Sequence, residues 1–240
     1  MAGITNSEFV KKLIPYGFDL VTIGGYNIDG PTIAAGEEIL KRGRSEFKIA
    51  EEEIIGHIEK EVNDIKNDFN VLISANLRST SVEPIIEVSK IKNLDLIEIN
   101  CHCRQEEIVN INCGQSMMKN TSYLSNFLKE IVIKSKSKVS VKIRANVEGV
   151  DTLEVSKIVD ECNADFLHVD AMKPNYNHCD LDIVKEISDN TDILIIGNNS
   201  IVDLKSAKDM INAGASGISM ARALIKGNVP FDLNEIKPLF

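Results

Sequence analysis

Short apolar segments alternate with amphipathic segments along most of the chain. Apolar runs that lack regular polar alternation are typical of strands buried on both faces of a parallel sheet, and apolar residues spaced three or four apart are typical of helices. We predict strands over 19–23, 71–76, 94–100, 139–144 and 165–170. We predict helices over 6–14, over most of 30–67 with a break near Gly43, and over 82–92, 116–133, 152–162 and 181–188. The stretches 193–201 and 213–223 each begin apolar, pass through small residues and open into a helix-like pattern.

This alternation favours one parallel sheet with right-handed crossovers. Counting a stub at Met1 as the first strand, the chain contains eight strand–helix units. We therefore predict an α/β fold, a (β/α)8 TIM barrel whose first strand is short or truncated. No linker or change in composition divides it, so residues 1–240 are expected to form a single domain.

Composition narrows the class of protein. The net charge of −9, from 27 basic and 36 acidic side chains, argues against an extended basic surface, although a local basic patch remains possible. Five cysteines without a regular framework suggest free thiols and a cytoplasmic protein. No apolar run approaches the ~20 residues of a membrane span, so we expect no membrane association.

The two Gly-containing turns near the end of the chain are candidates for a phosphate site. Small residues at Gly197–Ser200 and Ser219–Arg222 allow backbone N–H groups to approach an anion closely. Barrel enzymes often bind phosphate after their last two strands. The alternative is two ordinary strand–turn–helix connections.

Polar residues gather where the predicted strands end, which is the functional edge of a barrel. Lys142 lies within an apolar strand, and a buried lysine is rare unless it meets an anion. The charged runs at 51–53 and 59–61 are interpreted as solvated helix faces. The polar strand ends are Asn76, Asn100 to Cys103, Lys142, Arg144, His168, Asp170 and Asn198 to Ser200.

Five short motifs in order resemble those of the tRNA-dihydrouridine synthases, in their archaeal type, and more distantly the dihydroorotate dehydrogenases, which are barrels that bind flavin mononucleotide (FMN). Gly114 also keeps the family's spacing after Cys103. The motifs are Met1–Thr5, Asn100–Cys103, Val141–Arg144, Gly197–Ile201 and Met220–Ala223.

The chain departs from the family pattern at three places. His102-Cys103-Arg104 stands where the family has Gly-Cys-Pro, and Asp170 stands where the family has histidine. Asn199-Ser200 replaces Gly-Asp. The helical domain that follows the barrel in the synthases, and that binds tRNA, has no counterpart in residues 1–240.

The resemblance implies an FMN-dependent oxidoreductase that acts on a C=C bond of a pyrimidine-like ring. Cys103 would be the catalytic proton donor on the face opposite the flavin, and NADPH or NADH the electron source. Lys142 would stabilise negative charge on the flavin ring. Cofactor contacts are expected from Met1, Ala2, Asn76, Lys142, Asp170, Asn198, Asn199, Ser200, Ala221 and Arg222. Substrate contacts are expected from Asn100, His102, Arg144 and His168.

Several alternatives remain open. Asn76 could be a plain polar strand cap, Cys103 could be an inert buried thiol, and His168 could pair with Asp170 without chemistry. The barrel could use its cup for a sugar phosphate without flavin, or bind a flavin or a partner without catalysis. A metal site at Cys101 to Cys103 is disfavoured, because three successive donors cannot easily face one ion. Expected partners are a small pyrimidine-like substrate or tRNA, and a homo-oligomer is an open possibility. His57 and His178 are expected to face solvent, and Cys162 and Cys179 to have no role.

Overall fold

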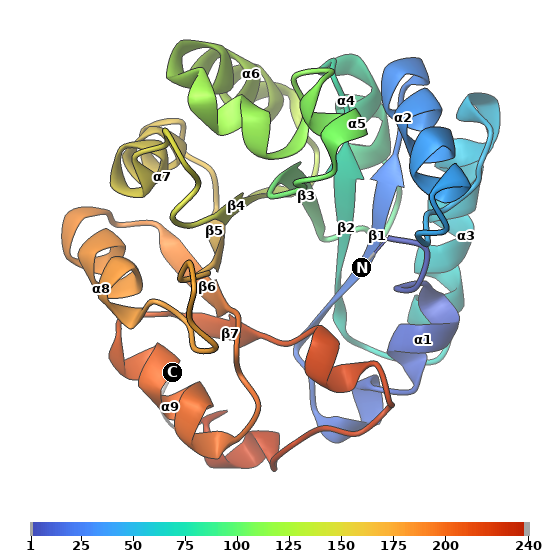
Figure 1. Cartoon of the computed structure of the whole chain (residues 1–240). Helices are drawn as coiled ribbons and strands as arrows, with labels where there is room; N and C mark the ends of the chain where they lie inside the picture. The colour runs from blue at the N-terminus through green and yellow to red at the C-terminus, as the bar shows by residue number, and fades with distance from the viewer. Residues whose placement is uncertain (1, 238–240) are drawn as a thin grey trace.

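The structure is a computed structural model that describes residues 2–237. Its centre is a parallel sheet of seven strands whose spatial order follows the chain. Figure 1 shows the strands curling around a central space with the helices outside them. The strands are β1 Leu20–Asn27, β2 Leu72–Arg78, β3 Leu96–Cys101, β4 Lys138–Arg144, β5 Phe166–Asp170, β6 Leu194–Asn198 and β7 Gly217–Ser219.

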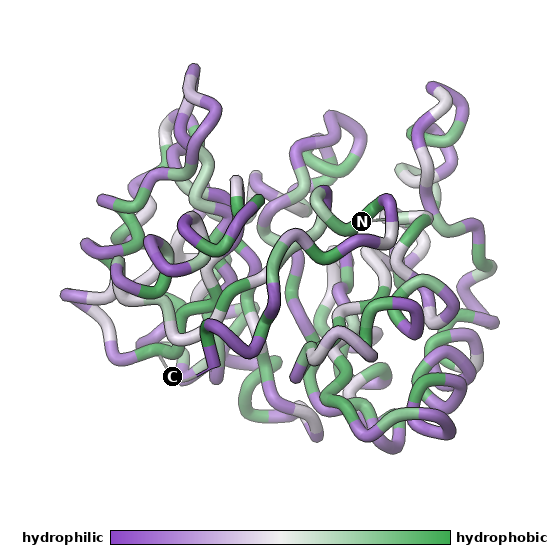
Figure 2. The backbone as a smooth tube through the Cα atoms, turned by 90° about the horizontal axis from the view of Figure 1, so that it is seen from below, coloured by the Kyte–Doolittle hydropathy of each residue, from purple (hydrophilic) through white to green (hydrophobic). Residues whose placement is uncertain are grey.

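The helices cover the outer face of this sheet. In Figure 2 they carry hydrophobic and hydrophilic stretches in turn, as amphipathic helices do. The α-helices are α1 Ser7–Lys11, α2 Gly30–Lys41, α3 Ile54–Lys66, α4 Glu83–Ser89, α5 Glu106–Val109, α6 Thr121–Lys134, α7 Thr152–Glu161, α8 Leu181–Asn190 and α9 Leu204–Asn212. Short 3-10 helices are η1 Ile14–Tyr16, η2 Glu51–Glu53, η3 Gly114–Lys119, η4 Arg222–Leu224 and η5 Leu233–Glu235. None of the helices in residues 2–237 is long and apolar enough to span a bilayer.

The two faces of the sheet differ in chemistry. Successive side chains of a strand point to opposite faces, so Ile97 and Ile99 of β3 pack outward under the helices while Glu98 and Asn100 face the inside. β4 repeats this with Val141 outward and Lys142 inward. The hydrophobic core therefore lies between the sheet and the helices. The inside of the curl is lined mainly by polar groups near the carboxyl ends of the strands.

The sheet does not close in the described part of the chain. β1 and β7 are its two edges, and no eighth strand is formed by residues 2–237. Near the start of the chain, Thr5 makes a single antiparallel bridge to Gly24. Gly3 has a left-handed backbone (φ +70°), so this segment turns instead of extending. The expected closed barrel of eight strands is thus corrected to a curled seven-stranded sheet with one bridge at the first position.

Several predicted boundaries also need correction. β1 was expected to end at Gly24-Gly25 but continues through them by a bulge, since both glycines have positive φ and the register shifts there. The predicted helical stretch 30–67 contains a non-helical stretch, residues 44–50, between α2 and η2. The helix expected at 116–133 is divided into η3 and α6 by Asn120, whose side chain caps α6. After β7 only the short 3-10 helices η4 and η5 follow within residues 2–237.

Two residues expected to face solvent do not. Glu61 of α3 is buried and accepts a hydrogen bond from the backbone N–H of Ser7, so the charged run 59–61 is not wholly solvated. His57 packs edge-on against Tyr26 with ring centroids 5.8 Å apart, and its Nε2 is buried. His178 is exposed as predicted, and Cys162 and Cys179 are buried.

Candidate active site

A cavity of about 1410 Å³ occupies the inside of the curl and extends from the amino ends of the strands to their carboxyl ends. Its lower part is lined by apolar residues such as Leu96 and Phe166, and its mouth by polar ones. Predicted site residues that line it are Ala2, Asn76, Asn100, His102, Cys103, Lys142, Arg144, His168, Asp170, Asn198, Asn199, Ser200, Ala221 and Arg222. Met1 lies outside the described residues.

Two series of hydrogen bonds between cavity-lining side chains end on the carboxylate of Glu98. In the first, Asn100 Nδ2 donates to Asn76 Oδ1 at 2.7 Å, and Asn76 Nδ2 donates to Glu98 Oε1 at 2.7 Å. In the second, His168 Nδ1 lies 2.6 Å from Glu98 Oε2, and His168 Nε2 lies 2.6 Å from the Ser219 hydroxyl. Both sets of donors therefore converge on one carboxylate.

Glu98 is ionised in this setting. Burial alone would raise its pKa, but the charges of His168 and Lys142 and the hydrogen bonds from His168 and Asn76 hold that pKa well below the ordinary value. Burial also lowers the pKa of His168, and the charge of Lys142 lowers it further. Because the ionised Glu98 can only accept hydrogen bonds, His168 Nδ1 carries the proton between the two side chains, and the Ser219 hydroxyl lies beside Nε2.

Lys142 stands between Asn100 of β3 and His168 of β5 in the sheet register. Its side chain is partly exposed to the cavity, and within residues 2–237 it makes no hydrogen bond or ion pair. The negative charge of the buried Glu98 lies close enough to interact with the Lys142 ammonium and compensates for its partial burial. Lys142 is therefore a cation available to a ligand in the cavity.

The loop that carries Cys103 is fixed from two sides. Asn100 Oδ1 accepts the backbone N–H groups of His102 at 3.2 Å and Cys103 at 2.8 Å. The Cys103 carbonyl accepts the N–H of Gln115 at 2.8 Å. Gly114 (φ +63°) packs against this carbonyl, and a Cβ there would lie 2.4 Å from the oxygen. A half-buried thiol at the mouth is the result.

A second polar cluster forms around the carboxylate of Asp170. His102 Nε2 lies 2.6 Å and Arg144 Nη2 lies 3.0 Å from Asp170 Oδ2, while Asn199 Nδ2 donates to Oδ1 at 2.6 Å. Burial would raise the pKa of Asp170, but the hydrogen bond from His102 and the charges around it hold it well below the ordinary range. Burial lowers the pKa of His102 to about 4, so its ring is neutral at pH 7.

The expected phosphate cup has an unusual backbone. Asn199 (φ +100°) and Ser200 (φ +54°) are both left-handed, although neither is glycine. No residue in the described part of the chain accepts a hydrogen bond from the N–H groups of Asn199, Ser200 or Ala221. The Asn198 side chain donates to the Ser219 carbonyl at 2.8 Å, so it holds the two loops together.

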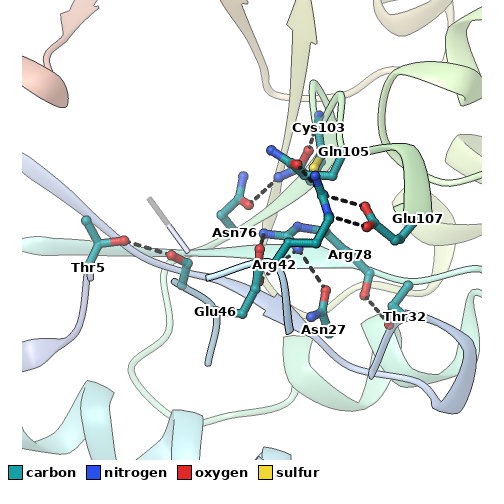
Figure 3. A network of polar contacts seen from close by, with 12 residues as sticks. Thr5, Asn27, Thr32, Arg42, Glu46, Asn76, Arg78, Cys103, Gln105 and Glu107 are labelled. Carbon is teal, nitrogen blue, oxygen red and sulfur yellow. Dashed lines mark hydrogen bonds and ion pairs between the residues drawn. The ribbon is translucent and has the colours of Figure 1, made fainter. Parts of the chain in front are cut away.

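A buried ion pair joins the mouth to the stretch 44–50. Arg78 at the end of β2 contacts Glu46 at 3.0 Å and Asn27 at 3.0 Å, and both charged side chains are 4% exposed. Figure 3 shows Arg78 between these partners and, in the same view, Cys103. The Nε of Arg78 is buried without a hydrogen bond in residues 2–237. This pair holds 44–50 in a non-helical conformation at the mouth.

Basic side chains outnumber acidic ones at the mouth, in contrast to the chain as a whole. Burial lowers the pKa of Arg144, and the negative charge of Asp170 raises it. The positive charges of Arg104 and Arg222 lower it further, so three guanidinium groups lie in one neighbourhood. Arg104 and Arg222 are exposed, and neither has an ion pair in the described residues. The local basic patch that net charge left open is present here.

Comparison with known proteins decides the family. A family model described as dihydrouridine synthase matches residues 49–235. The chain belongs to the dihydrouridine synthase family. It is 37% identical over 237 residues to an uncharacterized protein of Methanocaldococcus jannaschii, covering 95% of this chain and 88% of that one. This confirms the family resemblance inferred from the five motifs.

More distant relatives carry informative names. A probable tRNA-dihydrouridine synthase of Helicobacter pylori is 22% identical over 175 residues, which is 69% of this chain and 52% of the relative. A mouse protein named tRNA-dihydrouridine(20a/20b) synthase [NAD(P)+]-like is 24% identical over 149 residues, which is 60% of this chain and 46% of the relative. The chain thus spans about half the length of each of these two relatives.

Some important residues of the candidate site were missed in the sequence analysis. Glu98 interrupts an apolar strand, which is the same feature that identified Lys142, and it was overlooked. Arg78 follows Asn76 at the spacing of two that keeps both inside the curl. Conversely, His168 and Asp170 do not pair with each other but with Glu98 and His102 respectively. Asn76 lies two residues before the end of β2, so it is not the strand cap of the alternative interpretation. Its amide bonds the side chains of Glu98 and Asn100, and its contact with flavin stays a prediction.

Proposed function

We propose that this dihydrouridine synthase family member is an FMN-dependent oxidoreductase that reduces the C5–C6 double bond of a uracil ring presented by tRNA. The observation that carries the proposal is the convergence of Cys103, Lys142 and Arg144 on one cavity whose floor is apolar and whose mouth is basic. A flat ring fits between these groups, and anionic groups attached to it would meet the arginines.

The described residues fit the proposed cofactor. Lys142 is a cavity-facing cation without an ion-pair partner in the described part of the chain, as a flavin ring that accumulates negative charge requires. The unbonded N–H groups of Asn199, Ser200 and Ala221 suit a phosphate, and Arg222 adds a positive charge. Bound FMN would supply a hydride to one carbon of the double bond, with NADPH or NADH as the electron source.

Cys103 completes the reduction in this proposal. Once one ring carbon has accepted hydride, the neighbouring carbon needs a proton, and the Cys103 thiol donates it from the opposite face of the ring. Asn100 fixes the loop through two backbone hydrogen bonds, so the thiol needs little rearrangement.

The basic mouth supports an RNA substrate. Arg104, Arg144 and Arg222 lie at the rim, where phosphates next to a flipped-out base would pass. The names of the Helicobacter pylori and mouse relatives point to tRNA. An enzyme that modifies tRNA would act in the cytoplasm.

The cofactor assignment is tested by adding FMN to the purified protein and removing free cofactor by gel filtration. The proposal expects a yellow protein with about one FMN per chain. A second candidate, a flavin-free barrel that binds a sugar phosphate in the cup, predicts a colourless protein that FMN cannot protect from heat but a sugar phosphate can. That result would refute the flavin assignment.

A further inference from the structure

The connection between β5 and α8 forms a short hairpin at the rim of the cavity. Met172 and Cys179 make an antiparallel bridge at its base, and we call residues 172–179 the rim hairpin. Its side chains belong to the cavity lining. The Ser200 hydroxyl donates to the Asn177 carbonyl at 3.2 Å, so the rim hairpin lies beside the expected phosphate cup.

The backbone of the rim hairpin is held in place by a tight turn and by a neighbouring loop. At the tip, the Tyr176 N–H donates to the Lys173 carbonyl at 3.3 Å. Between them, Pro174 restricts its own φ and Asn175 is left-handed (φ +66°), which is the residue pattern of a type II turn. At the base, the Asn146 side chain donates to a hairpin carbonyl at 2.8 Å. The tip side chains are therefore presented in a fixed arrangement.

The tip presents an aromatic ring to solvent with a cation beside it. Tyr176 is 59% exposed, and in residues 2–237 its hydroxyl makes no hydrogen bond. The Lys173 ammonium lies 5.5 Å from the centre of this ring, and it also contacts Asp180 at 3.5 Å. The His178 ring lies 5.0 Å from the tyrosine ring, tilted by 54°, so it flanks that ring and does not stack flat upon it. The tyrosine ring therefore has surface available to a flat partner.

An exposed ring beside positive charge suits a single-stranded nucleic acid. Bases stack on aromatic side chains whatever their sequence, and nearby cations attract the phosphates. The rim next to the hairpin is basic, since Arg144 contacts the Asp170 carboxylate at 3.0 Å, where β5 ends, and Arg222 lines the same cavity. Charge complementarity therefore favours an RNA strand as the occupant of the Tyr176 ring.

We propose that the rim hairpin is a stacking site for the nucleotide next to the one that enters the cavity, with its base on Tyr176 and its phosphate near Lys173. This rests on the proposed function and deepens it, because it names the surface that holds the strand outside the cavity. Stacking requires no particular base, so the rim hairpin would hold the strand without reading its sequence.

The first arm of the test measures binding of a short, fluorescently labelled oligouridylate by anisotropy. We expect Tyr176→Ala to weaken binding by roughly tenfold, the scale for losing one base–aromatic stack, and Tyr176→Phe to keep it because the ring remains. Tyr16→Ala is the matched control and should bind like the unaltered protein, since Tyr16 is 49% exposed but lies outside the cavity lining. Thermal unfolding of all three variants should match that of the unaltered protein, because neither tyrosine is buried.

The second arm locates the contact. The oligouridylate carries one 5-iodouridine, placed at each position in turn, and it is irradiated with the unaltered protein so that a stacked aromatic side chain is cross-linked. We expect mass spectrometry to find Tyr176 cross-linked for at least one position. Cross-links confined to other parts of the chain would overturn the proposal.

The outcomes separate this inference from the proposed function. Equal affinity of Tyr176→Ala and the unaltered protein overturns the role of the rim hairpin, and so does equal weakening by Tyr176→Ala and Tyr176→Phe, since stacking would then not be the cause. An unaltered protein that binds no oligouridylate also overturns it. Dihydrouridine in cellular tRNA, which does not depend on free oligonucleotides, then shows whether the proposed function fails as well.

Discussion

Replacing Glu98 by glutamine should destabilise the fold although the shape of the side chain is kept. Glu98 accepts from Asn76 at 2.7 Å and from His168 at 2.6 Å, and both chains of donors point toward it. The amide oxygen of glutamine can still accept from Asn76, but its NH₂ group would face the His168 N–H. Lys142 would also lose its buried counter-charge. We expect Glu98→Gln to lower the free energy of unfolding by about 2–4 kcal/mol, since one charge-assisted hydrogen bond and one charge interaction are lost.

The assay is urea unfolding at pH 7 without cofactor, followed by circular dichroism. Glu148→Gln is the matched control, because Glu148 is exposed, and it should stay within ~0.5 kcal/mol of the unaltered protein. The folded-state pKa of Glu98 is depressed, so its contribution is full above the unfolded value of 4.5 and is lost as the pH falls toward the folded value. The difference between the two proteins should therefore shrink below pH 4.5. A Glu98→Gln protein as stable as the Glu148→Gln control would refute the reasoning.

Three further predictions concern the site. Lys142→Met should weaken FMN binding by ~10-fold or more, as expected for loss of a cation beside an anionic ligand. It should also destabilise the cofactor-free protein, because the buried Glu98 loses a nearby positive charge. Unaltered FMN affinity in a fluorescence titration would contradict the role of Lys142. Cys103→Ala should keep FMN binding but reduce turnover on tRNA by ~10²-fold or more, and a normal rate would remove the thiol from the reaction. Gly114→Ala should destabilise by about 2–3 kcal/mol in thermal unfolding, because a Cβ would lie 2.4 Å from the Cys103 carbonyl. Gly149→Ala, also at positive φ but with open space around it, should cost only ~1 kcal/mol, and equal losses would refute the packing argument.

The order of the strands and the polar ring at their ends could be predicted because both depend on local pattern. A lysine in the apolar strand 139–144 and small residues after 193–197 are visible without knowing their neighbours. Their positions in a parallel sheet follow from the alternation of strands and helices, so Lys142 and Asn199 were expected at one mouth.

Partners across the cavity could not be predicted in the same way. Asp170 and His102 contact each other although they are 68 positions apart in the sequence, and Glu98 and His168 do so although they are 70 positions apart. Pairings of this kind depend on side-chain geometry that one sequence does not reveal. Residues 44–50 escaped prediction for a related reason, because the buried pair of Glu46 with Arg78 holds them. The double glycine in β1 resembled a strand end, but the sheet absorbs it as a bulge.

The central claim is tested most directly by mass spectrometry of tRNA nucleosides from cells that have lost this protein. We predict that dihydrouridine disappears from at least one tRNA position, that the unaltered protein restores it and that the Cys103→Ala protein does not. A dihydrouridine profile that stays the same with and without the protein would contradict the account.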